Sequence, residues 1–215
     1  MWSTTFVFIL IIGYLLGSIP VGFIFIKVFT GQDVRQVGSG RTGSTNVMRA
    51  GGGKIALLTA AFDALKAATA VWLAQWLLPG NHWAAVIAGL AAVVGHVYSI
   101  FIWFKGGAGG GPTIGAAIAL WPWTVAIVVP LGAAVWYGVG YASVATVSFS
   151  LIIIAIMAVR WYLHQGPWEY ITYGVGALCI CLWALRPNLK RLLSGTERIH
   201  GWRAKRLKQQ NDHSS

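Results

Sequence analysis

Long apolar runs separated by short polar segments dominate the chain. A bilayer core of about 30 Å takes about 20 helical residues to cross, because a spanning segment must satisfy its own backbone hydrogen bonds. On this basis the pattern predicts membrane spans at residues 5–26, 55–78, 84–104, 122–138, 143–160 and 169–185. The predicted fold class is therefore an all-α membrane protein, a polytopic helical bundle.

One further apolar piece, PTIGAAIALW, lies between Gly111 and Trp121 and is too short to cross a bilayer unaided. It is predicted to be a short or tilted span, or a re-entrant helix. Pro122 and Pro130 interrupt the apolar pattern that follows it, because proline cannot donate a helical hydrogen bond. If the short piece counts as a crossing, the bundle has about seven transmembrane helices.

Composition agrees with a membrane protein, because 57% hydrophobic residues and a mean hydropathy of +0.67 leave little polar surface for a soluble domain. Sixteen Lys and Arg against five Asp and Glu give a net charge of +11. Such an excess also suits nucleic-acid binding, but no recognised binding motif accompanies it. The bases instead flank apolar segments, which is typical of topology signals and contacts with anionic lipids. We therefore expect membrane lipids as partners and no nucleic acid.

The basic residues also predict an orientation. They gather in residues 27–54 and 186–208, whereas the turn PGNHW carries none. By the positive-inside rule, the first polar segment and the tail are cytoplasmic and the N-terminus lies outside, which an odd number of crossings such as seven satisfies. We expect a multi-pass protein of the inner cell membrane with its active face in the cytoplasm. Residues 1–198 are predicted to form one polytopic domain, and residues 199–215 a basic, disordered cytoplasmic tail.

The first polar segment, VGSGRTGSTNVMRAGG at residues 37–52, places Gly38, Gly40 and Gly43 in a G-x-G-x-x-G spacing. A dinucleotide site would need a strand before these glycines and an acidic residue outside the membrane, but Asp63 falls inside a predicted span. Two interpretations stay open. The glycines either form a tight turn between helices, or they shape a nest for phosphate or carboxylate. The second would use polar donors from Ser39, Ser44, Thr45, Asn46 and Arg49.

Two more polar segments fall on the same predicted face. GGAGGGP, from Gly106 to Pro112, either lets backbone approach an anion closely or acts as a flexible hinge. His96 precedes it inside a span, where a histidine is either a satisfied packing residue or lines a cavity. The third segment, RPNLKRLLSGTER, is either a set of helix-end anchors or a row of side chains that reach back to the membrane face. Its candidate residues are Arg186, Asn188, Arg191 and Glu197.

Two other patterns carry no functional prediction. His164 and Glu169 form H-x4-E, close to the H-x4-D signature of soluble-type glycerolipid acyltransferases, but they fall on the predicted outer face and Pro167 interrupts them. Cys179 and Cys181 lie two positions apart in an apolar run, so on a helix they point in different directions and form no disulfide.

Taken together, these segments resemble the acyl-phosphate:glycerol-3-phosphate acyltransferase (PlsY) family over almost the whole chain, to about Arg198. The resemblance rests on GSIPVGFIFIKVFTGQDVRQVGSGRTGSTNVMRAGG, FDALK, GHVYSIFIWFKGG, GYAS and RPNLKRLLSGTE. The chain departs from the family pattern at several positions. Ala108 replaces a lysine, Leu185 a histidine and Arg41 an asparagine, while prolines are replaced by Thr42 and Ser99.

The resemblance implies transfer of an acyl group from acyl phosphate to the sn-1 hydroxyl of glycerol 3-phosphate, which forms lysophosphatidate for phospholipid biosynthesis. It implies no metal, no cofactor and no covalent intermediate. The catalytic residues it implies are Ser39, Ser143 and Glu197. The substrate-binding residues it implies are Gly38, Gly40, Arg41, Asn46, Arg49, His96, Gly106, Gly107, Asn188 and Arg191.

Two other functions stay open at this point. A paralogue with impaired catalysis, acting as a lipid-binding or regulatory membrane protein, would explain Ala108 and Leu185. Alternatively, Arg41 supplies the charge that is missing at position 108. A small transporter of phosphorylated metabolites would explain glycines that interrupt helices, but the polar groups gather on one face rather than along a path through the membrane.

Overall fold

The computed structural model describes residues 2–199, and within that range it contains helices and no strands. This confirms the all-α prediction. The helices are α1 (Trp2–Ser18), α2 (Val21–Thr30), α3 (Ser44–Leu77), α4 (His82–Val97), α5 (Gly110–Leu120), α6 (Thr124–Val139), α7 (Ala142–Tyr162), α8 (Glu169–Ala184) and α9 (Arg186–Leu193), with 3-10 turns η1 (Val34–Gln36) and η2 (Ile100–Ile102).

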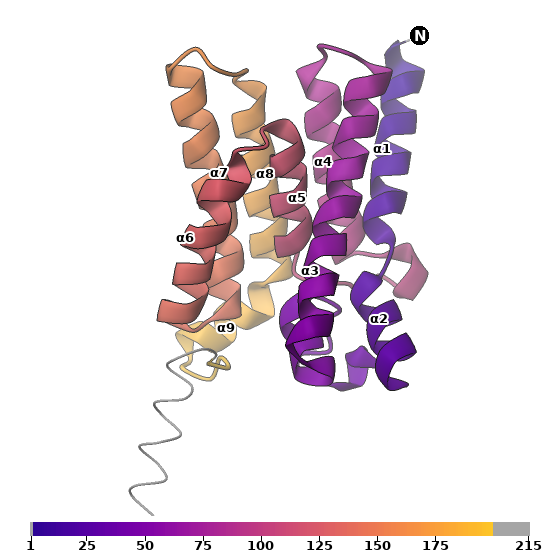
Figure 1. Ribbon diagram of the computed structural model, residues 1–215, viewed down its shortest axis with the longest axis vertical. Helices are drawn as coiled ribbons and strands as arrows, with labels where there is room; N and C mark the ends of the chain where they lie inside the picture. The colour runs from indigo at the N-terminus through magenta and orange to yellow at the C-terminus, as the bar shows by residue number, and fades with distance from the viewer. Residues whose placement is uncertain (1, 200–215) are drawn as a thin grey trace, which may run out of the picture.

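The helices stand side by side in two groups (Figure 1). Helices α1 to α4 form one group, α6 to α8 form the other, and α5 lies between them. α5 packs against α3 on one side and α7 on the other, so it joins the two groups. The first loop (residues 31–43) and α9 lie at the same end of the bundle, opposite the N-terminus and the connection between α7 and α8.

In the part of the chain that the structure describes, four helical segments are long and apolar enough to cross a membrane: Thr4–Thr30, Ser44–Leu77, His82–Ile102 and Ala142–Tyr162. A fifth is possible if α8 and α9, which are bent by 67°, count as one span. α5 and α6 are shorter apolar helices, and the 11 residues of α5 extend only about 16 Å at 1.5 Å per residue. Seven crossings and the orientation of the termini therefore stay predictions. The predicted tail beyond residue 199 lies outside the described residues.

The first predicted span, residues 5–26, is broken between α1 and α2. Pro20 has no N–H to donate and disfavours a helical conformation at Ile19. The carbonyls freed at the break are occupied by polar side chains from elsewhere in the fold. Ser99 Oγ donates to Ser18 O at 2.5 Å, and Lys66 Nζ donates to Ile19 O at 2.7 Å. The break therefore provides hydrogen-bond acceptors for two buried polar side chains inside the bundle.

The polar segment predicted between residues 27 and 54 is mostly helical. α2 extends to Thr30 and α3 begins at Ser44, which leaves the first loop as the only connection between them. α3 is interrupted at Gly52, where φ is 84° and ψ is 177°, a conformation that favours glycine. The predicted span at 55–78 thus begins after a kink, and the first turns of α3 belong to the polar end of the bundle.

Close approach of helix backbones fixes the positions of the polar segments. A Cβ at Gly17 of α1 would lie 2.1 Å from Ala92 O of α4, and one at Gly115 of α5 would lie 1.9 Å from Ala64 O of α3. Small residues at such contacts are the usual means of tight helix packing in membranes. Because α5 packs so closely on α3, the glycine-rich segment before it lies beside the first turns of α3.

Candidate active site

A cavity of about 500 Å³ lies between the first loop, α3, α5, α6, α7 and α9. We call it the catalytic cavity. Its polar lining includes Ser39, Arg41, Ser44, Thr45, Asn46, Arg49, Asp63, His96, Ser143, Thr146, Asn188 and Glu197. Its apolar lining includes Met48, Leu57, Ile114, Val129, Trp136, Phe149 and Leu185. The structure thus gathers residues from all three polar segments around one space.

Asn46, at the start of α3, holds the first loop in place. Its buried carboxamide accepts from the backbone N–H of Ser39 at 3.0 Å and from Arg49 Nη1 at 3.1 Å. Its Nδ2 donates to Val37 O and Arg41 O, each at 2.9 Å. Because both ends of the carboxamide are engaged by the protein, Asn46 acts first as a positioning residue, and direct contact with a substrate stays a prediction.

The glycine spacing in the first loop has a structural explanation. Gly38 and Gly40 have φ values of 57° and 70°, where L side chains are strained. A Cβ at Gly38 would also lie 2.3 Å from Asn46 Oδ1. Gly43 has an ordinary φ of −73°. The tight-turn interpretation therefore accounts for the first two glycines, and the same turn presents Ser39 to the catalytic cavity.

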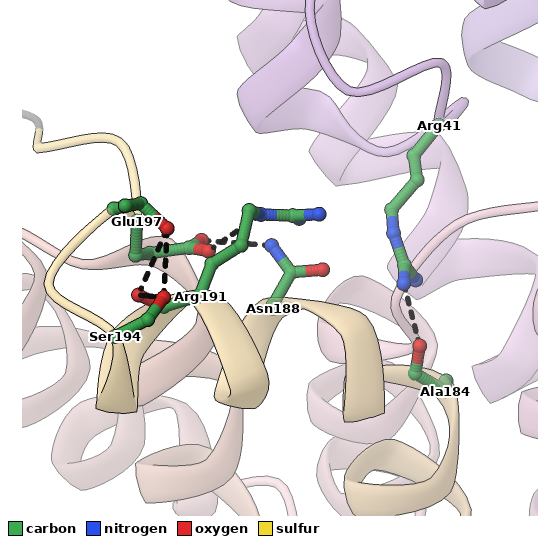
Figure 2. Close-up of polar contacts among 7 residues, drawn as sticks. Arg41, Ala184, Asn188, Arg191, Ser194 and Glu197 are labelled. Carbon is green, nitrogen blue, oxygen red and sulfur yellow. Dashed lines mark hydrogen bonds and ion pairs between the residues drawn. The ribbon is translucent and has the colours of Figure 1, made fainter.

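Arg41 connects the first loop to the glycine-rich segment and to the end of α8. From the first loop its guanidinium donates to Gly107 O at 3.4 Å and to Ala184 O, at the end of α8, at 2.5 Å (Figure 2). A cation is favoured there because helix carbonyls point their negative ends toward it. Burial lowers the pKa of Arg41 from its ordinary value, and the nearby Arg191 lowers it further. Its hydrogen bond to Gly107 O places the charge next to the residue that precedes Ala108.

The glycine-rich segment packs on the end of α4 rather than forming a free hinge. Gly106 N donates to Val97 O at 3.1 Å, and Gly107 N donates to His96 O at 3.0 Å. A Cβ at Gly106 would lie 1.9 Å from His96 O, and one at Gly107 would lie 2.0 Å from His96 Nε2. These two glycines are therefore required by close approach to His96.

His96 belongs to a buried cluster with Asp63 and Lys66. Lys66 Nζ lies 2.8 Å from Asp63 Oδ1, 3.1 Å from His96 Nδ1 and 2.7 Å from Ile19 O. His96 Nδ1 also lies 3.4 Å from Asp63 Oδ1. Because an ammonium group can only donate, the shorter contact with Lys66 makes Nδ1 an acceptor and favours the neutral form with its proton on Nε2. Nε2 lies beside Gly107, and the ring lines the catalytic cavity. His96 is thus both a partnered packing residue and a cavity residue.

Asn188, Arg191 and Glu197 form a second cluster at α9, which we call the rim. Glu197, nearly buried, accepts from Asn188 Nδ2 at 2.7 Å and from Arg191 Nε at 3.2 Å. Asn188 Oδ1 is buried and has no hydrogen-bond partner among the described residues. In Figure 2 this oxygen points away from Glu197, toward the side where Arg41 lies.

A second unpartnered oxygen, the buried Oγ of Ser143 at the start of α7, lines the same cavity. Buried polar atoms in folded proteins normally have a partner, so both oxygens point to a ligand or water that supplies one. Glu197 holds the rim in place, and Asn188 lines the catalytic cavity, whereas Arg191 pairs with Glu197 outside the cavity lining.

Sequence reasoning did not include Asp63 and Lys66 among the site residues. Asp63 lines the catalytic cavity, and Lys66 fixes the His96 ring. The available signal was the presence of ionisable residues inside apolar spans, where a charge is costly unless it pairs or functions. Their place beside His96 depends on how α3 packs on α4, which periodicity does not give.

A cavity with polar groups at one end and apolar walls suits a molecule that has a charged head and a fatty chain, so the bundle has the features of a lipid-modifying membrane enzyme. The model of the glycerol-3-phosphate acyltransferase family matches residues 7–195. The chain therefore belongs to the glycerol-3-phosphate acyltransferase (PlsY) family.

Individual relatives agree with this assignment. A glycerol-3-phosphate acyltransferase from Rubrobacter xylanophilus is 39% identical over 201 residues, which covers 92% of this chain and 96% of the relative. The crystal structure of PlsY (YgiH), an integral membrane glycerol 3-phosphate acyltransferase, is similar in its glycerol 3-phosphate form, with a TM-score of 0.80 and 31% identity. Its lysophosphatidic acid form gives a TM-score of 0.77 and 30% identity. Each covers 92% of this chain and 96% of the other.

Proposed function

We propose that this protein transfers a fatty acyl group from acyl phosphate to the sn-1 hydroxyl of glycerol 3-phosphate, at the cytoplasmic face of the inner membrane. The hydroxyl oxygen bonds to the acyl carbon, the bond from that carbon to the phosphate oxygen breaks, and the hydroxyl proton leaves with the departing phosphate. The products are lysophosphatidate and inorganic phosphate. The observation that carries the proposal is the catalytic cavity, which joins cationic and hydroxyl groups to an apolar wall.

The cationic groups suit the phosphates of both substrates. Arg41 and Arg49 line the cavity from the first loop and α3, and Arg191 of α9 lies near Arg41. Guanidinium groups bind phosphate by paired hydrogen bonds. Asn188 Oδ1 can accept a hydrogen bond from a glycerol hydroxyl, because no described residue donates to it. The acyl chain then lies along the wall formed by Leu57, Val129, Trp136 and Phe149.

Acyl phosphate is already activated, so the protein needs mainly to orient the two substrates and to stabilise the negative charge that develops on the carbonyl oxygen. The residues proposed for this are those with hydrogen-bond donors at the cavity. Ser39 and Ser143 supply hydroxyl groups, and His96 supplies the Nε2 proton that Lys66 fixes.

Arg41 supports an active enzyme despite Ala108. Its guanidinium donates to the carbonyl of Gly107, one position before Ala108, so a half-buried cation stands near the place where the family pattern has lysine. Leu185, in place of the family histidine, lines the same cavity and adds an apolar surface. We therefore favour catalysis over the impaired paralogue.

The test is turnover by the purified protein with acyl phosphate and glycerol 3-phosphate, measured by lysophosphatidate formed and phosphate released in equal amounts. Acyl coenzyme A replaces acyl phosphate in a matched reaction. Turnover with acyl phosphate alone is the expected result. Turnover only with the thioester would overturn the donor, and binding of glycerol 3-phosphate without turnover from either donor would favour the impaired paralogue. Movement of glycerol 3-phosphate into sealed vesicles containing the protein would favour a transporter.

A further inference from the structure

A second cavity, of about 610 Å³, lies on the other side of Arg41 from the catalytic cavity. It is bounded by the segment between α4 and α5 and by the corner between α8 and α9. Among the described residues, its charged lining consists of Arg41, Lys105, Arg186 and Lys190 and contains no carboxylate. We call it the cationic pocket. None of the last three cations has a part in the acyl transfer proposed above.

The positive charge of this pocket is not neutralised within the described chain. Between residues 2 and 199, no Asp or Glu forms an ion pair with Lys105, Arg186 or Lys190. The Arg186 guanidinium is held in place, because it stacks 3.3 Å above the Trp183 ring and Nε donates to Trp183 O at 3.1 Å. Cations gathered around one space are expected to attract an anion with several acceptor oxygens, such as a phosphate.

An exposed apolar loop adjoins the cationic pocket. Ile100, Phe101, Trp103 and Phe104 are all exposed, Trp103 to 81%. Trp103 and Phe104 have φ values of 56° and 59°, an uncommon conformation for large side chains that turns the chain sharply at this point. The loop projects from the side of the bundle (Figure 1), and Phe104 also lines the pocket. Exposed aromatic residues next to basic ones are typical of a membrane interface.

Arg41 and its neighbours separate the two cavities. Arg41 lines both, and its hydrogen bonds to Gly107 O and Ala184 O place the guanidinium between the glycine-rich segment and the end of α8. Gly107 and Ala184 line only the cationic pocket, whereas Ala108 and Leu185, the next residues in the chain, line only the catalytic cavity. The backbone therefore forms a wall with a different environment on each face.

We propose that the cationic pocket is a second binding site, which takes the phosphate group of an anionic lipid while its acyl chain lies against the apolar loop at residues 100–104. Lys105, Arg186 and Lys190 would contact the phosphate, and Trp183 and Phe104 would pack on the glycerol and the upper part of the chain. Free inorganic phosphate is the other source of the same chemistry. The site is separate from the acyl transfer, so its test does not depend on turnover.

The first experiment measures how fast an amine-specific reagent modifies each lysine in protein held in nanodiscs of zwitterionic lipid. Glycerol 3-phosphate is kept saturating, so that the catalytic cavity is occupied. Added phosphatidate is expected to slow modification of Lys105 and Lys190 several-fold. Lys27 and Lys54, which are also exposed, serve as internal controls, and their rates of modification should not change.

The probes distinguish the possible ligands. If inorganic phosphate protects Lys105 and Lys190 as well as phosphatidate does, the pocket is a phosphate site whose ligand is the free ion. If a neutral monoacylglycerol protects them equally, or if all four lysines slow together, the proposed phosphate recognition is overturned. Unchanged rates at Lys105 and Lys190 with every probe would overturn the site itself.

A pair of double variants then tests the charges. Lys105→Gln with Lys190→Gln removes two charges from the pocket, and Lys27→Gln with Lys54→Gln removes the same number elsewhere. The first pair should weaken phosphatidate binding about tenfold or more, whereas the second should leave it near the parent value. A thermal melt of each protein shows whether the fold is kept. Equal weakening by both pairs would indicate diffuse attraction of an anionic lipid and would contradict the proposed site.

Discussion

The buried cluster and the rim use similar side chains in opposite ways. In the buried cluster, Lys66 directs its donors to Asp63, His96 and Ile19, and its side chain is 6% exposed. At the rim, Glu197 is equally buried, but its partner Arg191 is 45% exposed. Beside them, Asn188 Oδ1 accepts no hydrogen bond from any described residue. The charges of the first cluster are paired within the fold, whereas the rim leaves an amide oxygen without a partner among the described residues.

This difference separates the polar residues that support the fold from those that are available to a substrate. A charge inside the membrane is costly, so Lys66 must be neutralised by the protein itself. A polar atom that binds a ligand is recognised instead as a buried atom that has no hydrogen-bond partner within the protein. His96 has both properties, because Nδ1 is engaged by Lys66 while the ring lines the catalytic cavity.

The largest effect is expected from breaking the buried cluster. Lys66→Met would leave the Asp63 carboxylate buried without its main partner and would free the Ile19 carbonyl. Removing one member of such a pair typically costs about 3–5 kcal/mol of folding stability. Thermal unfolding in detergent should show a large loss for Lys66→Met and a partial recovery when Asp63→Asn is added. A single variant as stable as the parent would show that the ion pair does not support the fold.

The rim should respond in binding rather than in stability. Asn188→Ala removes the unpartnered oxygen and one hydrogen bond to Glu197, so we expect KM for glycerol 3-phosphate to rise about tenfold, which corresponds to about 1.4 kcal/mol. Ser194→Ala, on the same exposed segment and outside the cavity lining, is the matched control and should change KM little. If Asn188→Ala lowers the melting temperature strongly and leaves KM unchanged, the oxygen has no role in binding.

These two clusters also show how far the sequence could predict the structure. Apolar run lengths were sufficient for the helical class, because membrane burial leaves helices as the simplest way to satisfy the backbone. They did not show the break at Pro20 or the helical start of α3 at Ser44. Local proline and glycine chemistry set those boundaries, and the freed carbonyls are satisfied by Ser99 and Lys66, far away in the chain.

For the site, sequence reasoning identified the polar segments but not what each residue does in them. Substrate binding by Gly38 and Asn46 stays a prediction, and the structure adds that Gly38 serves a turn and Asn46 ties the first loop together. Gly107 serves the packing of His96. Such roles depend on which atoms meet across helices, and a single sequence carries no record of those distances.

In His96, one ring nitrogen supports the fold and the other is available to a substrate, so two substitutions can separate the two roles. In His96→Asn the amide lies near the former Nδ1, so the contact with Lys66 and the stability should be kept while the donor to the cavity is lost. In His96→Gln the amide lies near the former Nε2, so the reverse is expected. We predict a several-fold higher KM in the Asn variant than in the Gln variant, and a lower melting temperature in the Gln variant.

Nitrogen NMR of ¹⁵N-histidine-labelled parent protein provides a direct check on the ring. The Lys66 contact requires the proton of the neutral ring on Nε2. A dominant Nδ1–H form would contradict the assignment, even if both variants lose activity.

The smallest effect is expected at Ala108, because Arg41 already places a cation beside it. Ala108→Lys would add a second positive charge near the half-buried guanidinium, so repulsion offsets part of the new phosphate contact, and kcat/KM should rise by less than about tenfold. In an Arg41→Ala background the same lysine meets no competing charge and should recover most of the activity that Arg41→Ala removes. The benefit of the lysine should therefore be larger without Arg41 than with it. A double-mutant cycle measures this coupling from kcat/KM of the four proteins. Purely additive effects would show that Arg41 and the family lysine act independently, and that Arg41 serves only to join the first loop to Gly107 and Ala184.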